Sequence, residues 1–305
     1  MRPFANFEPF LQLIMLLLIS FFTVTVFIFA GQGLVSWLWG VPMTEISSVM
    51  QNFDNPQAIR INRLMLLFQH LGLFVVPAML FAQLSSPGWT KYLRFNPMPW
   101  KYLWGSVALI FLGIPTINAL AWLNGQMVLP EFLETIERLF QSLEENAADL
   151  TAALTETGDM GDLLANLFVI AFLASLGEEM IFRGLLLPIF ARWTGSKHLG
   201  VWISAVLFSA MHLQFYGFLP RLVLGALLGY LFLWSRSIWA PIVAHFTNNA
   251  WALIGIFLVS RGEMDADVDS FQPVDLGIKL AIAAILMVWL SVNRKPAGGS
   301  VDIDD

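Results

Sequence analysis

Ser175-Leu176-Gly177-Glu178-Glu179-Met180-Ile181-Phe182-Arg183-Gly184 is the stretch of this sequence that decides which fold the chain can adopt. It places two adjacent carboxylates and an arginine inside an apolar run that extends from residue 163 to residue 193. A charged side chain at the centre of a bilayer costs about 2.5–3.5 kcal/mol on insertion scales, so such residues usually face a bundle interior and mark a functional site. The rest of the chain must therefore supply helices that bury this stretch and polar groups that meet it.

The composition predicts a membrane protein. Of 305 residues, 57% are hydrophobic and only 12% are charged, and the mean hydropathy is +0.70. A soluble domain has about 25% charged residues. The net charge of −6 argues against a nucleic-acid partner. The chain has no cysteine, which excludes disulfides, a thiolate nucleophile and a cysteine-based zinc site.

Eight apolar stretches approach the roughly 20 residues that a membrane-spanning helix needs. They comprise residues 9–31, 63–84, 102–124, 163–192, 198–215, 218–235, 238–260 and 273–292. We therefore expect an all-α, polytopic helical bundle with about eight transmembrane helices. Residues 1–295 would form a single integral membrane domain, and the acidic tail at 296–305 would be disordered.

Lysine and arginine in alternate loops predict the orientation of the bundle, because cytoplasmic loops carry an excess of these residues. With the exception of Arg60 and Arg63, the opposite loops are acidic or neutral, so both termini are expected in the cytoplasm. The cytoplasmic positions are Arg2, Lys91, Arg94, Lys101, Arg192, Lys197, Arg236, Arg294 and Lys295. After Pro130, apolar residues at helical spacing predict an amphipathic helix at about 131–145 on the outer surface, with a role as a lid as the alternative.

Three consecutive predicted spans carry polar residues at one-turn spacing. Glu179 and Arg183 share one helix face, while Glu178 points about 100° away. In the next predicted span Phe208 lies four residues before His212, and a later span has His245 four residues before Asn249. Burying these groups is unfavourable unless they meet each other or water, so we expect them to converge on one polar cavity. The alternative is separate structural roles, namely one ion pair and isolated interhelical hydrogen bonds.

The other two histidines have simpler interpretations. His198 lies at a predicted cytoplasmic boundary, and His70 is interpreted as a packing residue of its span. Counting residues from the span ends places Asn249 nearer than His245 to the depth of Glu178 and His212. A glutamate beside a histidine can activate water as a general base. A second histidine and a carboxamide can stabilise an oxyanion, and together these groups suit amide hydrolysis.

The three motifs together resemble the CAAX protease and bacteriocin-processing family of intramembrane endopeptidases. The family patterns Glu-Glu-x-x-x-Arg, Phe-x-x-x-His and His-x-x-x-Asn are matched in order by the residues just described. The resemblance covers about residues 163–260, and the first three spans show nothing diagnostic. It implies a bacterial-type relative of CAAX prenyl protease 2, and this chain is therefore expected to be an integral protein of the bacterial inner (plasma) membrane.

The resemblance also implies roles for the site residues. Glu178 and His212 would activate water, His245 and Asn249 would form the oxyanion hole, and Glu179, Arg183 and Phe208 would support the site. A mechanism without a metal is favoured, although Glu178, His212 and His245 are also a chemically reasonable zinc set. The expected substrate is a hydrophobic, membrane-associated or lipidated peptide within or beside the bilayer. The competing class is a non-catalytic membrane protein, such as a transporter or an immunity or scaffold protein.

Overall fold

The computed structural model describes residue 4 and residues 7–53, 55–155, 159–264 and 273–293. These residues form helices and connecting turns, and no β-strand occurs among them. The α-helices are α1 (Pro9–Trp39), α2 (Ile46–Met50), α3 (Pro56–His70), α4 (Val76–Ser85), α5 (Trp89–Tyr92), α6 (Trp100–Gly125), α7 (Glu134–Thr155), α8 (Met160–Asn166), α9 (Ala174–Ile181), α10 (Leu187–Thr194), α11 (Lys197–Met211), α12 (Phe218–Ser235), α13 (Trp239–Ser260) and α14 (Pro273–Val292).

Short segments of other helical geometry interrupt or extend these helices. Two are single 3₁₀ turns, η2 (Glu131–Leu133) and η5 (Phe215–Gly217). Three are π-helical: η1 (Leu71–Val75), η3 (Leu167–Leu173) and η4 (Phe182–Leu186). π-helical segments are rare and frequently occur at functional sites. Two of the three lie directly before and after α9, the helix that carries both glutamates.

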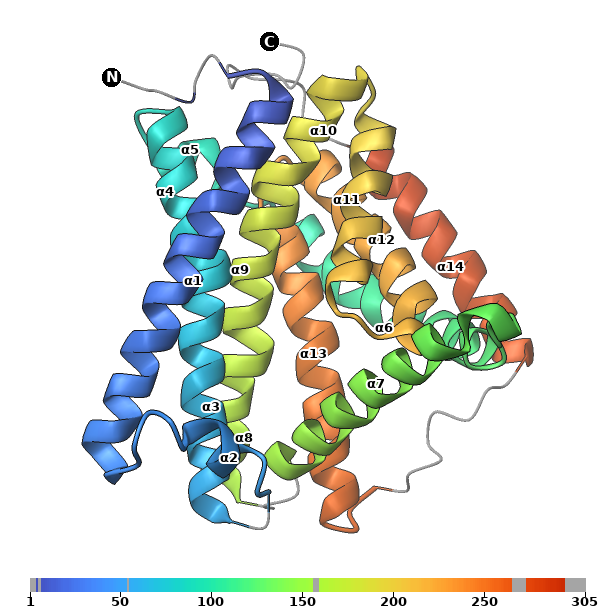
Figure 1. Ribbon diagram of the computed structural model, residues 1–305. Coiled ribbons are helices and arrows are strands. Elements are labelled where there is room, and N and C mark those ends of the chain that lie inside the picture. Colours follow the sequence, from blue (N-terminus) through green and yellow to red (C-terminus); the bar gives the residue numbers. More distant parts are fainter. Residues whose placement is uncertain (1–3, 5–6, 54, 156–158, 265–272, 294–305) are drawn as a thin grey trace.

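Six helical stretches among the described residues are long and apolar enough to cross a membrane. They are Pro9–Trp39, Pro56–Ser85, Trp100–Gly125, Met160–Thr194, Phe215–Ser235 and Trp239–Ser260, and two shorter apolar helices cover Lys197–Met211 and Leu276–Val292. The predicted all-α, polytopic membrane bundle is confirmed. All eight expected spans fall on helices. That all eight cross the membrane, and that both termini lie in the cytoplasm, stay predictions. Figure 1 shows the first described turn of α1 and the last of α14 at the same end of the bundle.

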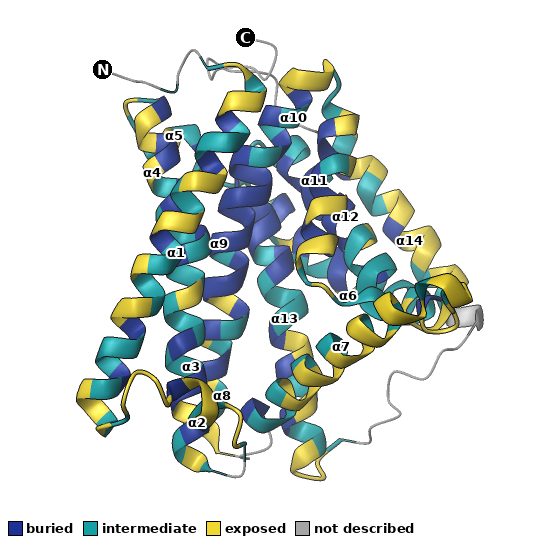
Figure 2. Ribbon diagram, viewed as in Figure 1, coloured by how far each residue is buried: buried dark blue, intermediate teal, exposed yellow. Residues whose placement is uncertain are grey.

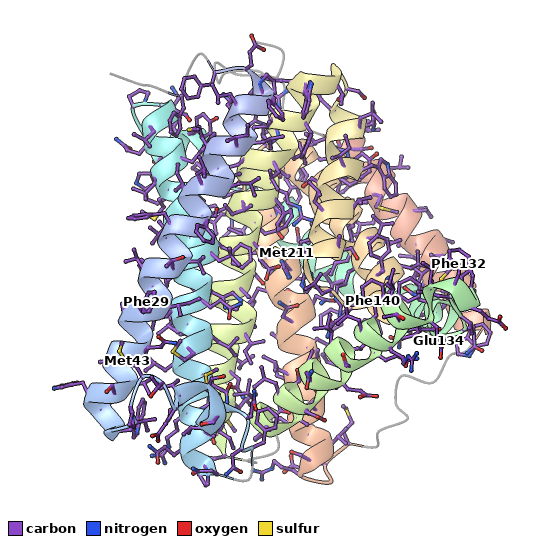
Figure 3. The ribbon with its side chains drawn as sticks, in the orientation of Figure 1. Phe29, Met43, Phe132, Glu134, Phe140 and Met211 are labelled. Carbon is purple, nitrogen blue, oxygen red and sulfur yellow. The ribbon has the colours of Figure 1, made fainter. Side chains whose placement is uncertain are left out.

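The helix expected at residues 198–215 ends earlier than its hydropathy predicts. α11 stops at Met211, and Leu213 turns the chain with a positive φ of 55°. Its 15 residues span about 22 Å, which is less than the roughly 30 Å of a bilayer core. Met211 therefore lies part-way along the bundle (Figure 3), whereas α8 and α13 extend beyond the α11–α12 hairpin (Figure 1). The short helix therefore ends part-way through the depth of the bundle.

Burial is concentrated around α9. Figure 2 shows buried residues gathered on α9 and its continuation, while α7 is mostly exposed. At Gly177 an added Cβ would lie only 2.7 Å from the Cβ of Phe74, so a glycine there lets η1 approach α9 directly beside Glu178. The backbone oxygen of Gly72, in the same π-helical segment, accepts a hydrogen bond of 2.6 Å from Thr23 Oγ1 on α1. η1 is thereby packed between α1 and α9.

The amphipathic helix expected at 131–145 is present and longer, since α7 continues to Thr155. Figure 1 shows it crossing the bundle obliquely near the turn that joins α11 to α12. Phe140 stacks on Phe215 with ring centroids 5.6 Å apart, and Figure 3 shows Phe140 directed toward that hairpin. The Tyr216 hydroxyl donates to Glu137 Oε1 at 3.2 Å. α7 is thus attached to the turn that follows His212.

Candidate functional site

The two glutamates and the arginine of the opening stretch are buried at the centre of the bundle. The exposed fractions of Glu178, Glu179 and Arg183 are 6%, 0% and 0%. Arg183 Nη1 donates to Glu179 Oε1 at 2.6 Å, across one helical turn as the spacing predicts. Arg183 Nη2 donates to the backbone oxygen of Gly225 on α12 at 2.9 Å. The ion pair therefore also joins α9 and η4 to a third segment of the chain.

His245 of α13 meets both glutamates. Its Nδ1 lies 2.9 Å from Glu179 Oε1 and donates to it, while its Nε2 lies 3.9 Å from Glu178 Oε2. Glu179 Oε1 consequently accepts from an arginine and from a histidine. The oxygens Glu178 Oε2 and Glu179 Oε2 are buried and have no hydrogen-bond partner among the described residues. The adjacent carboxylates differ because only Glu179 is directly bonded to positively charged or N–H donor groups.

Phe208 of α11 is the apolar residue around which these side chains pack. The Arg183 guanidinium lies over its ring, 4.8 Å from the centroid, which is cation–π geometry. The His212 and His245 rings meet it edge-on, with centroids 5.1 Å and 5.6 Å away. Phe208 itself is buried, with an exposed fraction of 1%. It therefore keeps three polar groups from three helices at fixed separations.

His212 is the residue that caps the C-terminal end of α11. Its Nδ1 lies 2.8 Å from the backbone oxygen of Phe208. A carbonyl oxygen only accepts, so Nδ1 carries the proton, and Nε2 of the neutral ring is an acceptor. The positive φ of Leu213 then turns the chain away. The local structure thus fixes both the tautomer and the direction of the ring.

Asn249 lies one turn beyond His245 on α13 and makes weaker contacts. Its Nδ2 is 3.5 Å from the backbone oxygen of Ile170 in η3, at the long limit for a hydrogen bond. The side chain of Asn248 donates to Asn249 Oδ1 at 3.2 Å. It is His245, rather than Asn249, that contacts the glutamates, so the comparison of depths by residue count was wrong.

Arg221, in the first turn of α12, is a residue of the site region that the sequence reasoning missed. Its guanidinium donates to the backbone and side-chain oxygens of Gln214, two residues after His212. Its charge also attracts Glu178 and, on α7, Glu144 through space. The sequence did contain a signal for Arg221, since it is a lone positively charged residue inside the span predicted at 218–235.

A groove begins beside this turn. Its volume is about 390 Å³, and it lies between one face of α7, the end of α13 and Gln214. The lining residues are Glu144, Ala147, Ala148, Thr151, Ala152, Thr155, Gln214 and Ile256. The small side chains of α7 leave this space open toward the segment that carries His212.

The three residues of the possible zinc set, Glu178, His212 and His245, are not gathered around one point. No group of three or more His, Asp or Glu side chains in the described ranges is placed to hold a metal ion. Glu178 and His245 approach each other, but His212 does not complete a ligand cluster with them. The residues present therefore do not fit a metal centre in this arrangement.

The fold and the buried polar site define an integral membrane protein with a charged cluster inside its bundle. Residues 160–251 match the family described as type II CAAX prenyl endopeptidase Rce1-like. This segment contains all three motifs, so the resemblance to that family is confirmed over these residues.

One curated relative, described as the uncharacterized protein YpbD of Bacillus subtilis (strain 168), is 26% identical over 91 residues. That alignment covers 28% of this chain and 43% of the relative, so the chain matches less than half of the relative's length. No solved structure matches the chain.

Proposed function

We propose that this protein is a membrane-embedded endopeptidase that hydrolyses a peptide bond of a hydrophobic or lipidated peptide. The observation that carries the proposal is the inequality of the two glutamates. Glu179 Oε1 holds Arg183 and His245, whereas the Glu178 side chain forms no hydrogen bond among the described residues, and its Oε2 is buried. An unsatisfied carboxylate oxygen at this depth is costly, and such residues are typical of functional sites.

In the proposed reaction Glu178 and His212 activate a water molecule. Both present acceptor atoms: Glu178 through Oε2 and His212 through Nε2, because Nδ1 of His212 is bound to the Phe208 carbonyl. The water oxygen attacks the peptide carbonyl carbon as its proton passes to one of these acceptors. That proton then moves to the leaving amine as the carbon–nitrogen bond breaks. The acceptor is regenerated without a covalent intermediate.

His245 and Asn249 are the proposed donors to the oxyanion. Asn249 Nδ2 has only a long hydrogen bond to Ile170, so it can reorient toward a developing charge. His245 already donates through Nδ1 to Glu179, so it donates through Nε2 as well only when both nitrogens are protonated. Glu179 and Arg183 hold the histidine in place and support the reaction without contacting the substrate.

The substrate class follows from the family match and from the surroundings of the site. The family description names a CAAX prenyl endopeptidase, whose substrates carry a lipid. A peptide reaching a site between membrane-spanning helices must tolerate apolar surroundings, which favours a hydrophobic or lipidated chain. The relative from Bacillus subtilis supports a bacterial membrane as the location of this protein.

The test uses purified protein in lipid nanodiscs and two dye-quenched peptides. One peptide carries a farnesylated cysteine followed by aliphatic residues and a free C-terminus, and the other is an unlipidated apolar peptide. Wild type should cleave at least one, and Glu178→Gln and His212→Ala should each lower kcat/KM at least about 100-fold, as expected for loss of a general base.

Glu145→Gln and His198→Ala are matched controls, because both side chains are exposed and lie outside the site. Their kcat/KM should stay within about twofold of wild type, a range of about 0.4 kcal/mol. Failure of wild type to cleave either peptide, or equal turnover by wild type and both site variants, would refute the proposal and favour a non-catalytic membrane protein.

A further inference from the structure

His70 has one ring nitrogen engaged and one available. Its Nδ1 lies 2.8 Å from the backbone oxygen of Leu66, one turn earlier in α3. Since that carbonyl can only accept, Nδ1 carries the proton and Nε2 of the neutral ring is an acceptor. Nε2 has no hydrogen-bond partner within the described part of the chain, although His70 lies inside a membrane-spanning stretch. This nitrogen is not enclosed by protein atoms, so a bound molecule can reach it.

The face of α3 that carries His70 is the face that meets the glutamate helix. His70 and Phe74 are four residues apart, and their ring centroids are 5.8 Å apart. Phe74 packs against Gly177, where an added Cβ would be 2.7 Å from the Cβ of Phe74. Glu178 is the next residue. His70 is therefore one turn from the point at which η1 meets the helix of the proposed base.

His70 and His212 lie near each other, on helices that enter the bundle from opposite ends. α3 and α8 run side by side in the same direction along the bundle, so His70 precedes Phe74 toward the end where α7 crosses (Figure 1). α11 descends from the opposite end and stops at Met211, and His212 is close enough to His70 to interact with it electrostatically. His70 is only partly buried. It can therefore contact a molecule that occupies the space beside His212.

A peptide bound in this space would bring backbone N–H groups that require acceptors, because water is scarce at this depth. The acceptors already present have other uses. Glu179 Oε1 is occupied by Arg183 and His245, and Glu178 and His212 are the proposed bases for water. Glu179 Oε2 also lacks a partner among the described residues, but its side chain is fully buried, whereas His70 is partly exposed and its Nε2 has no such use.

We propose that His70 is a substrate-binding residue whose Nε2 accepts a hydrogen bond from a backbone N–H of the bound peptide. The inference rests on the proposed function, because it takes the ligand to be a peptide. It places one wall of the peptide site on α3, outside the segment that carries the three motifs. The bound chain would then lie between α3 and the α11–α12 hairpin.

Two substitutions separate the two nitrogens of the ring. In His70→Asn the side-chain amide can still donate to the Leu66 carbonyl, but nothing occupies the position of Nε2. In His70→Gln the longer amide reaches that position and can accept. His198→Asn is the matched control, because its ring is exposed and bonds Tyr230 at the far end of α11. All three are compared with wild type on the farnesylated peptide in nanodiscs.

His70→Asn should raise KM about tenfold, equivalent to about 1.4 kcal/mol, and leave kcat within about twofold. The reason is that the lost hydrogen bond stabilises the bound substrate and the transition state equally. His70→Gln should stay within about threefold of the wild-type KM, and His198→Asn should not change it. Melting temperatures of the four proteins should agree within about 2 °C, because no buried pair or core packing is removed. An unchanged KM in His70→Asn, a fall in kcat alone, or equal loss in both His70 variants with lower melting temperatures would overturn the inference.

Measuring peptide affinity in a variant that lacks the proposed base tests the role of His70 separately from the proposed function. The affinity of a dye-labelled peptide is measured by fluorescence anisotropy for Glu178→Gln and for Glu178→Gln combined with His70→Asn. About tenfold weaker binding in the double variant supports the role of His70 even if Glu178→Gln still hydrolyses peptide, a result that would refute only the proposed chemistry. Equal binding by the two proteins overturns the role of His70 whatever the outcome for hydrolysis.

Discussion

Replacement of Arg183 by alanine should destabilise the bundle far more than replacement of Glu178 by glutamine. Arg183 is fully buried and bonds Glu179 Oε1 at 2.6 Å and the Gly225 carbonyl at 2.9 Å. Removing one partner of a buried ion pair costs about 3–5 kcal/mol, because the surviving charge stays buried. His245 still donates to Glu179 in the variant, so the lower end, about 3 kcal/mol, is expected.

That free energy corresponds to a measurable fall in melting temperature. At about 2–4 °C per kcal/mol for a chain of a few hundred residues, Arg183→Ala should melt about 6–12 °C below wild type. Glu178→Gln keeps the shape of the side chain and breaks no hydrogen bond of Oε2, so its melting temperature should stay within about 3 °C of wild type. Activity should nevertheless be lost in Glu178→Gln.

The chain contains a matched control for this comparison. Glu134 and Arg138 on α7 have the same four-residue spacing, with 3.4 Å between charged atoms, but their side chains are 66% and 68% exposed. Exposed pairs contribute about 0–1 kcal/mol, so Arg138→Ala should change the melting temperature by at most about 4 °C.

The assay is thermal unfolding in detergent followed by the fluorescence of native tryptophans. If Arg183→Ala melts like wild type while Glu178→Gln collapses, the roles assigned to the two glutamates are reversed.

Two further predictions concern packing and metal dependence. Gly177→Ala should destabilise the bundle by about 1–3 kcal/mol, because its Cβ would meet Phe74 at 2.7 Å in a packed interior; a melting temperature equal to that of wild type would show that η1 can move aside. Dialysis against a metal chelator should leave peptidase activity within about twofold, because no metal-binding cluster is formed by the described residues, and loss of activity that added Zn²⁺ restores would contradict this.

Hydropathy was sufficient to predict the helices and insufficient to predict where they end. Leu213 and Phe215 continue the apolar run of α11, so composition alone extends this helix to residue 215. The structure ends it at Met211, because Leu213 adopts positive φ and His212 bonds back to Phe208. Such local geometry leaves no trace in the hydropathy of the segment.

The convergence of the motifs could be predicted from residue spacing, but the depths of their members could not. Estimating depth by counting residues from the ends of the spans assumes straight α-helices that each cross the whole bundle. α11 does not span the bundle, and η3 and η4 change the number of residues per turn next to α9. Because of these departures, His245 instead of Asn249 reaches the glutamates. Arg221 was overlooked, and His70 was interpreted as a packing residue, because neither has a polar companion at one-turn spacing in the sequence.

The short length of α11 bears on the supply of water to a hydrolytic reaction within a lipid bilayer. A helix about 22 Å long leaves about 8 Å of a 30 Å hydrocarbon layer that it does not cross, and His212 lies at that inner limit. The groove along α7 opens from Gln214, two residues further on. Hydration of the site would thus depend on a local thinning of the apolar barrier on the side of this groove.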